Sequence, residues 1–151
     1  MVIEFGLVVV LLALAGVHAY WGLGGYWPGV DGPSLSERVV GTRGSPPGFL
    51  ASGLVALALL AAAGVVVSAH ERIAFGLKSW IVYGGYGCLI LVFGLRGLAT
   101  YLTPVFRYAE GTPFYDLNRR YYSPLCMILA ALLIVDYPPG FETLLNRLPP
   151  T

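Results

Sequence analysis

The chain has 151 residues, of which 57% are hydrophobic and only 11% charged, and its formal net charge is +1. Because a soluble domain carries about 25% charged residues, a charge density this low means that much of the surface faces something apolar. The near-neutral charge gives no electrostatic case for binding nucleic acid, which usually needs a clustered basic face. Two cysteines without a Cys-x-x-Cys spacing exclude the common zinc and thioredoxin-like patterns.

Four apolar stretches, taken in chain order, predict four transmembrane helices. The first covers about residues 5–23, the second 49–69, the third 79–102 and the fourth about 122–137. Each stretch is apolar all round rather than along one stripe, which is typical of a helix in lipid or in a fully buried setting. A crossing uses about 20 residues, so four crossings account for most of the chain. The predicted fold is an all-α integral membrane four-helix bundle, formed by one domain over residues 1–151.

The first stretch has the position of a signal peptide, and Val17-His18-Ala19 fits the small-residue rule for cleavage. A signal peptide begins with basic residues, whereas the only early charge here is Glu4. We therefore expect this segment to stay in the protein as a helix.

The fourth stretch is the shortest of the four. It reaches spanning length only with Tyr121, Tyr122 and Tyr137 as anchors at the membrane interfaces. Ser123 suits the N-cap of this helix and Pro124 its first turn, where the missing N–H costs nothing. We therefore expect the helix to begin at Ser123-Pro124.

Small residues spaced four apart predict close contacts between helices. Such pairs let two backbones approach where no hydrophobic effect drives helix association. The alternative is that Ala and Gly are simply frequent in this chain. The pairs are Ser52 with Ala56, Ala58 with Ala62, and Gly84 with Cys88.

Four spans would place the first and third loops on the same face of the membrane, and this face collects most of the polar and aromatic residues. A functional site is therefore expected there, although an interfacial aromatic belt explains many of the rings. The candidate residues for a ligand or polar site are His18, Tyr20, Trp21, Arg96, Asp116, Arg119, Arg120, Tyr122 and Cys126.

Arg96 is the one charged residue within the third stretch. By the helical rise of about 1.5 Å per residue it lies roughly 9 Å inside the end of its span, and His18 and Cys126 lie at similar depths. An arginine at membrane depth is a functional hypothesis that requires a partner. Asp116 is the preferred partner, followed by His18 or a tyrosine hydroxyl. The alternative is that the guanidinium group snorkels to the interface.

The same depth estimate disfavours two kinds of cofactor or redox chemistry. His18 and His70 lie near opposite faces, roughly 20 Å apart by the helical rise, so one chain cannot supply both axial ligands of a haem. Cys88 and Cys126 differ by about 15 Å in depth, whereas the Cα atoms of a disulfide lie within about 7 Å. We therefore expect no cofactor, no metal and no disulfide.

Several motifs together resemble an uncharacterised family of small bacterial membrane proteins, filed as a domain of unknown function with four predicted spans. The resemblance covers nearly the whole chain and implies the bacterial inner (plasma) membrane as its location, with several crossings, but no activity. Some members have an acidic residue shortly after the arginine of the third span, where this chain has Ala99-Thr100. The motifs are residues 18–27 (His-Ala-Tyr-Trp-Gly-Leu-Gly-Gly-Tyr-Trp), Val39-Val40-Gly41 leading to Pro46-Pro47, Arg96-Gly97-Leu98, residues 113–117 (Pro-Phe-Tyr-Asp-Leu) and residues 121–126 (Tyr-Tyr-Ser-Pro-Leu-Cys).

Three functions remain open on the sequence alone. The first is a non-enzymatic protein that binds a membrane lipid, a small lipophilic amphiphile or a membrane-protein partner at the face formed by the first and third loops. The second is a membrane-embedded enzyme that uses His18, Asp116 and Arg96, although no catalytic motif supports it. The third is a subunit of an oligomeric transporter. We favour the first, a non-enzymatic function, over the other two.

Overall fold

The structure is a computed structural model that describes residues 2–70, 78–102 and 104–137. This part of the chain is helical and contains no strand, which confirms the all-α prediction. The helices are α1 (Val2–Gly22), α2 (Gly32–Val39), α3 (Phe49–Ala69), α4 (Ser79–Leu102), the 3₁₀ helix η1 (Pro104–Ala109), α5 (Pro113–Leu117), the π-helical turn η2 (Asn118–Tyr122) and α6 (Ser123–Val135).

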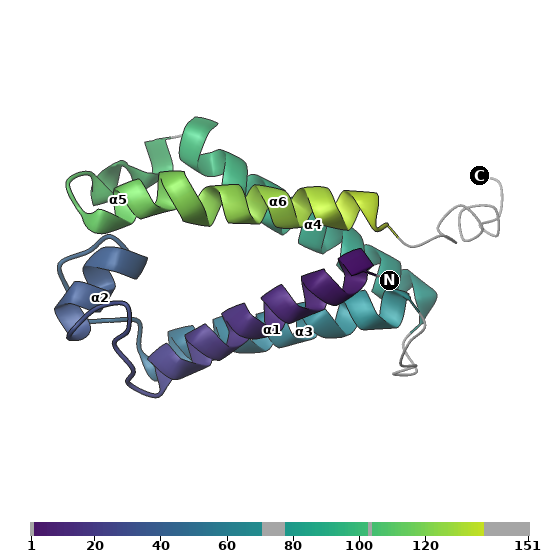
Figure 1. The fold of residues 1–151 in the computed structure, drawn as a ribbon, viewed down its shortest axis with the longest axis horizontal. Coiled ribbons are helices and arrows are strands. Elements are labelled where there is room, and N and C mark those ends of the chain that lie inside the picture. The colour runs from purple at the N-terminus through teal and green to yellow at the C-terminus, as the bar shows by residue number, and fades with distance from the viewer. Residues whose placement is uncertain (1, 71–77, 103, 138–151) are drawn as a thin grey trace.

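The long helices pack as two antiparallel pairs (Figure 1). Helix α1 lies along α3, and α4 lies along α6, while α3–α4 and α1–α6 contacts join the two pairs. The first loop, with α2, and the third loop, with α5, lie at the same end of the molecule, and α2 packs against α5 there. The N-terminus lies at the opposite end (Figure 1). Elements that are distant in sequence therefore meet where the sequence places its polar and aromatic residues.

Three helices in the described part of the chain, α1, α3 and α4, have the length and hydropathy needed to cross a membrane. They contain 21, 21 and 24 residues, close to the roughly 20 residues that a crossing requires. Most of their residues are not buried against the rest of the chain, and large aliphatic side chains cover their outer surfaces. An apolar exterior of this kind indicates a membrane protein.

The fourth helix begins at Pro113, ten residues before Ser123, where the sequence predicts its start. Pro113 occupies the first turn of α5, and the helix continues without a break through η2 into α6. Ser123 is therefore fully buried inside the helix, and the prediction that it forms the N-cap is wrong. The earlier start escaped the hydropathy pattern because the residues from 113 to 121 include a carboxylate, an amide and two arginines.

The π-helical turn has a local cause in Pro124. Proline has no N–H, and in a regular α-helix its ring collides with the carbonyl four residues earlier. The Ser123 N–H instead bonds to the Asn118 carbonyl, five residues back, which is the spacing of a π-helix. The widened turn accommodates the proline and places Asn118 on the side of the helix that faces α4.

Close helix contacts involve only some of the predicted small residues. Ser52 and Ala56 are both buried on α3. Ala58 is exposed, and so are both Gly84 and Cys88. The prediction that Ala58 with Ala62 and Gly84 with Cys88 form packing pairs is therefore wrong. The tight approach between α4 and α6 occurs at Gly97 instead, where an added Cβ would lie 2.5 Å from Met127 Cγ and 3.0 Å from the Ser123 carbonyl oxygen. The hydropathy pattern gives no helix orientation, which is why it could not identify the buried glycine.

Candidate functional site

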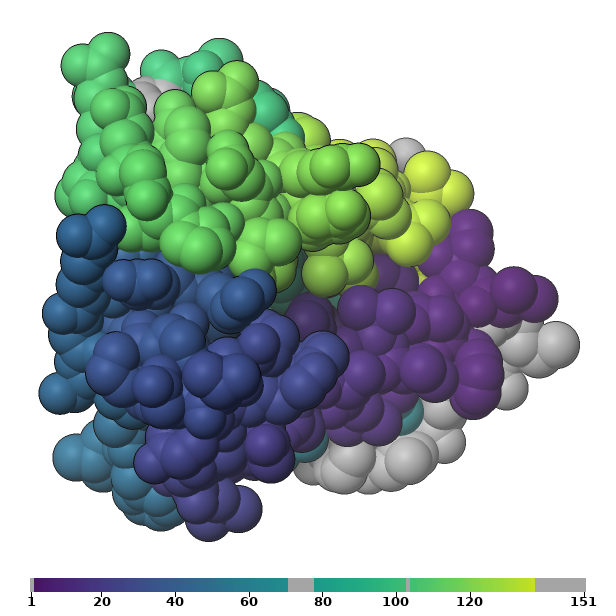
Figure 2. Space-filling model, turned by 60° about the vertical axis from the view of Figure 1, so that its left-hand side comes forward, coloured from purple at the N-terminus to yellow at the C-terminus, as the bar shows by residue number. Residues whose placement is uncertain are grey.

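A cavity of about 450 Å³ lies between the four long helices at the end that carries the first and third loops. Leu14, Leu59, Phe93 and Leu129 give it apolar walls from α1, α3, α4 and α6 in turn. Figure 2 shows the surface hollowed where α1, the first loop and the start of α6 meet. The cavity is the natural place to look for a ligand, because ligand sites are concave and mostly apolar with a few polar groups.

Five of the nine residues predicted from the sequence line this cavity: His18, Trp21, Arg96, Tyr122 and Cys126. His18, Arg96 and Cys126, which the helical rise places at a common depth, thus surround one space. The structure brings these five together from α1, α4, η2 and α6.

The other four candidates lie elsewhere at the same end of the molecule. Tyr20 lines a shallow apolar depression on the side of α1, together with Trp27. Arg119 lines a separate pocket beside η1. Asp116 and Arg120 are exposed and are not among the residues that line the cavity.

Arg96 has a different partner from the one predicted. Its Nη2 donates a hydrogen bond of 2.9 Å to Asn118 Oδ1, and its Cζ lies 4.7 Å from the centre of the Phe106 ring. Asp116 makes no ion pair with Arg96 in the described part of the chain. The other terminal nitrogen of Arg96, Nη1, is buried within the protein. That Nη1 has no hydrogen-bond partner among the described residues.

Asn118 is the centre of a buried network between α4 and the π-helical turn. Its amide nitrogen donates to Thr100 Oγ1 at 2.9 Å, and its amide oxygen accepts from Ser123 Oγ at 3.3 Å as well as from Arg96. The hydroxyls of Thr100 and Ser123 are themselves 2.6 Å apart. A buried amide with all of these partners fixes the position of the Arg96 side chain. Sequence reasoning missed Asn118, since a lone Asn in a predicted loop carries no signal.

His18 and Trp21 form the α1 side of the cavity. His18 Nδ1 lies 2.8 Å from the Leu14 carbonyl oxygen, which can only accept, so Nδ1 carries the proton. In neutral histidine this leaves Nε2 as an acceptor. The two rings pack edge to face with centroids 5.0 Å apart. Trp21 Nε1 in turn donates to the Trp27 carbonyl at 2.7 Å and so holds the first loop, which supplies Trp27 and Pro28 to the cavity lining.

The first and third loops are joined above the cavity. The Tyr108 hydroxyl donates to the Val40 carbonyl at 2.9 Å, and the Tyr122 hydroxyl donates to the Arg38 carbonyl at 3.2 Å. Gly41 has a φ of +86°, and a Cβ there would lie 2.8 Å from the Phe114 ring. Glycine is the residue that fits both the positive φ and the close approach of the ring. With the two hydrogen bonds, this close approach joins the first and third loops into a single cover.

Helix α2 within this cover has a well-defined beginning. Asp31 Oδ1 accepts from the Ser34 N–H at 2.9 Å, and the Ser34 hydroxyl accepts from the Asp31 N–H at 3.0 Å. This reciprocal capping satisfies donors that the first turn leaves free. Hydrogen bonds from the Ser34 side chain and backbone hold the pKa of the Asp31 carboxyl below its usual value.

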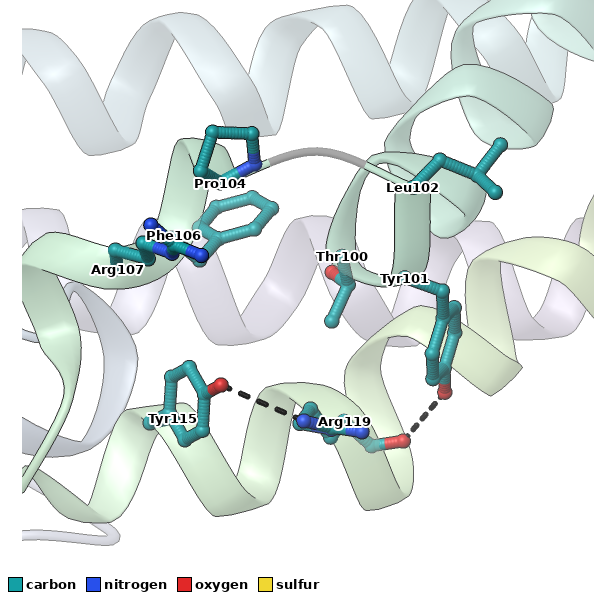
Figure 3. A pocket seen from close by; sticks show the side chains of 8 residues that line it. All are labelled: Thr100, Tyr101, Leu102, Pro104, Phe106, Arg107, Tyr115 and Arg119. Carbon is teal, nitrogen blue, oxygen red and sulfur yellow. Dashed lines mark hydrogen bonds between the residues drawn. The ribbon is translucent and has the colours of Figure 1, made fainter.

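A second pocket, of about 330 Å³, lies outside the bundle where α4 ends (Figure 3). Arg107 from η1 and Arg119 from η2 both line it, together with Tyr101 and Tyr115. Arg119 Nη1 donates to the Tyr115 hydroxyl at 3.4 Å, and the Tyr101 hydroxyl donates to the Arg119 carbonyl at 2.6 Å. The pocket is polar and open to the surroundings, unlike the cavity between the helices.

The opposite end of the molecule has its own polar contact, which the sequence did not indicate. His70 Nε2, at the end of α3, lies 3.3 Å from Asp136 Oδ2 at the end of α6. The Tyr86 hydroxyl donates to the Asp136 carbonyl at 3.2 Å, and its ring packs edge to face on Tyr137. Because both helix ends take part, this contact joins the two helix pairs.

The part of the chain that the structure describes contains no group of three or more His, Cys, Asp or Glu side chains placed to hold a metal ion. Both cysteines are free thiols: Cys88 is exposed on α4, and Cys126 is partly buried at the cavity.

A family model described as a protein of unknown function (DUF3995) matches residues 11–133, which is most of the chain and includes every residue that lines the cavity. Among curated proteins and among solved structures, no match is found.

Proposed function

The chain belongs to the DUF3995 family of proteins of unknown function, and we propose that it is a membrane protein that crosses the bilayer four times and binds an amphiphilic molecule between its helices. The proposal is a binding function without catalysis. The observation that carries it is Arg96, which lines an apolar cavity and whose buried Nη1 has no hydrogen-bond partner in the described part of the chain.

The fourth crossing in this proposal is the continuous helix formed by α5, η2 and α6. Helix α6 alone has 13 residues, about 20 Å by the helical rise, and is shorter than a hydrocarbon core of about 30 Å. The whole segment 113–135 is about 34 Å long by the same rise. Its apolar part lies along α4, which is itself long enough to cross. A location in the bacterial inner membrane is part of the proposal and rests on the family resemblance.

The chemistry of the ligand follows from the groups that face the cavity. The Arg96 guanidinium pairs with no carboxylate in the described part of the chain, so an anionic or carbonyl-bearing head group would supply the missing acceptor. A hydrogen bond to a charged group contributes about 1.5–3 kcal/mol. The aliphatic and aromatic walls would hold the apolar body, and a cavity of about 450 Å³ is of the size that takes a small molecule or one lipid chain.

Native mass spectrometry of the protein, extracted from membranes without detergent exchange, tests the proposal. Wild-type protein should carry an amphiphile that is lost in Arg96→Met, which removes the donors, and in Cys126→Phe, which fills the cavity. Arg120→Met is the matched control, because Arg120 is exposed outside the cavity. A wild-type protein without any bound amphiphile, or full retention in both cavity variants, would contradict the proposal.

The enzymatic alternative is weaker than the sequence suggested. Asp116 is exposed and does not line the cavity, so of the two candidate proton-transfer groups only His18 lies there. A binding role needs only the Arg96 donor and the apolar walls, and both are present.

A further inference from the structure

We propose that the pocket beside η1 binds the phosphate group of an anionic phospholipid from the surrounding bilayer. This site is separate from the cavity between the helices and takes a different ligand. The proposal is carried by two arginines that converge on one polar pocket, and by a strip of exposed leucines that leads to the same pocket along α4.

Three segments meet to form the pocket (Figure 3). The end of α4 supplies Thr100 and Tyr101, η1 supplies Arg107, and the helix that follows supplies Tyr115 and Arg119. Residues 107 and 119 are distant in sequence, so the fold and not the local pattern brings the two cations together. Of these two arginines, only Arg119 is among the site residues predicted from the sequence.

Contacts with two tyrosines hold Arg119 in place for an anion. The Tyr115 hydroxyl accepts a hydrogen bond from Arg119 Nη1. The Arg119 guanidinium group also lies near the Tyr115 ring, with the Arg119 Cζ atom 5.8 Å from the ring centre. The Tyr101 hydroxyl bonds to the Arg119 backbone and so fixes the base of the side chain. No carboxylate lines the pocket in the described part of the chain, so the charges of Arg107 and Arg119 are not neutralised there. Arginine is a residue suited to binding phosphate, because its guanidinium group donates several charge-assisted hydrogen bonds.

A row of leucines on the outer face of α4 indicates that the phosphate belongs to a lipid. Their spacing of four, three and four residues places them on one side of the helix, and the last one lines the pocket itself. Because this face is apolar and leads to the arginines, an acyl chain can lie along it while the head group reaches the pocket. The row comprises Leu91, Leu95, Leu98 and Leu102, whose exposed fractions are 64%, 65%, 44% and 74%.

The depth of the site fits the same ligand. Leu102 is the last residue of α4, which is long enough to cross the bilayer, so the pocket lies at the level where a crossing helix meets the head groups. Tyrosine rings concentrate at this level, and each basic residue near an anionic leaflet contributes about 1 kcal/mol of attraction. A phospholipid is therefore favoured over a soluble phosphate compound.

Native mass spectrometry of the full chain in detergent, titrated with phosphatidylglycerol and with phosphatidylcholine, tests this site. Wild-type protein should bind phosphatidylglycerol more tightly than phosphatidylcholine. Arg107→Gln/Arg119→Gln should lower the affinity for phosphatidylglycerol about tenfold or more, since it removes two charge-assisted contacts. The matched control is Arg43→Gln/Arg120→Gln, which makes the same charge change at exposed positions outside the pocket and should bind as wild type does.

Three results would overturn the proposal: equal binding of the two lipids by wild-type protein, an equal loss in the control pair, or displacement of phosphatidylglycerol by inorganic phosphate at the same concentration. The last result would identify a site for free phosphate instead of a lipid. If the double variant does not fold, the single variant Arg107→Gln takes its place in the lipid titration. Cys126→Phe, which alters the cavity and no residue of this pocket, should keep this lipid while it loses the cavity ligand, so the two proposals can fail separately.

Discussion

Arg96 and Asn118 are joined by a hydrogen bond of 2.9 Å that connects α4 to the π-helical turn. Asn118 is fully buried, and its further hydrogen bonds to Thr100 and Ser123 fix the amide that holds the arginine. One Arg96 nitrogen is thereby satisfied within the protein, while Nη1 is buried and has no hydrogen-bond partner in the described part of the chain. Because the amide is neutral, it holds the Arg96 side chain without neutralising its positive charge, whereas a carboxylate partner would neutralise it.

Asn118→Ala is expected to destabilise the protein. The substitution removes the acceptor of Arg96 Nη2 and the donor to Thr100, and each buried group left unsatisfied costs about 1–3 kcal/mol. Thermal unfolding followed by circular dichroism in detergent should show a clearly lower midpoint. Arg120→Ala, at an exposed site, should unfold at the wild-type temperature. An unchanged midpoint for Asn118→Ala would show that the network contributes nothing to stability.

Two glycines of α4 should respond to the same substitution with opposite signs. A Cβ at Gly97 would press on Met127 and on the Ser123 carbonyl, and overpacking of this kind costs about 1–3 kcal/mol. A Cβ at Gly84 meets nothing within 4 Å, so Ala there should gain up to about 1 kcal/mol of helix propensity. Unfolding midpoints of Gly97→Ala and Gly84→Ala check this. Equal shifts in both variants would argue against close packing at Gly97.

Trp21→Phe should open the cavity without removing an aromatic ring from its wall. The variant loses the hydrogen bond from Trp21 Nε1 to the Trp27 carbonyl, which holds the first loop over the cavity. In a Cys88→Ser background, a maleimide reagent should then label Cys126 faster than in the parent protein. Trp80→Phe makes the same change at an exposed position at the other end of α4 and should leave the rate unaltered. Equal labelling rates in all three proteins would mean that the loop does not cover the cavity.

The cap of α2 gives a pH dependence of known sign. Because the ionised Asp31 accepts the Ser34 hydrogen bonds, its pKa is lowered in the folded protein. Its contribution to the stability of α2 is therefore fully present above the ordinary aspartate pKa and is lost as the pH falls through the lowered value. Hydrogen–deuterium exchange of residues 32–39, corrected for the intrinsic rate, should be constant near neutrality and rise only in acid. Asp31→Asn keeps a capping side chain, and the acid-dependent rise should disappear.

Hydropathy predicted the elements of this fold that are defined by contact with an apolar medium. The helices over 49–69 and 79–102 coincide with the apolar stretches, and the first helix differs from its stretch by a few residues. The common depth of His18, Arg96 and Cys126 followed from helical rise alone, and these side chains surround one cavity. That the cavity is a binding site stays a prediction.

Contacts between polar side chains were beyond this reasoning. Asp116 was the preferred partner of Arg96 because opposite charges attract, yet Asn118 lies two residues further along the helix and faces α4. A π-helical turn decides which of the two faces inward, and its presence depends on how Pro124 is accommodated in a helix that begins at Pro113. The hydropathy of residues 113–121 indicates a loop, so neither the early start nor the turn could be predicted.

The π-helical turn also makes the structure of this segment sensitive to the number of residues that it contains. A π-helical turn holds one residue more than the α-helical turn it replaces. Because the wide turn already absorbs its extra residue, deleting a single residue between 118 and 122 would restore an α-helical turn without rotating α5 relative to α6, and the Pro124 ring would then collide with the carbonyl four residues earlier. Substitution scanning cannot detect such a constraint, because it preserves length; variation by insertion and deletion would.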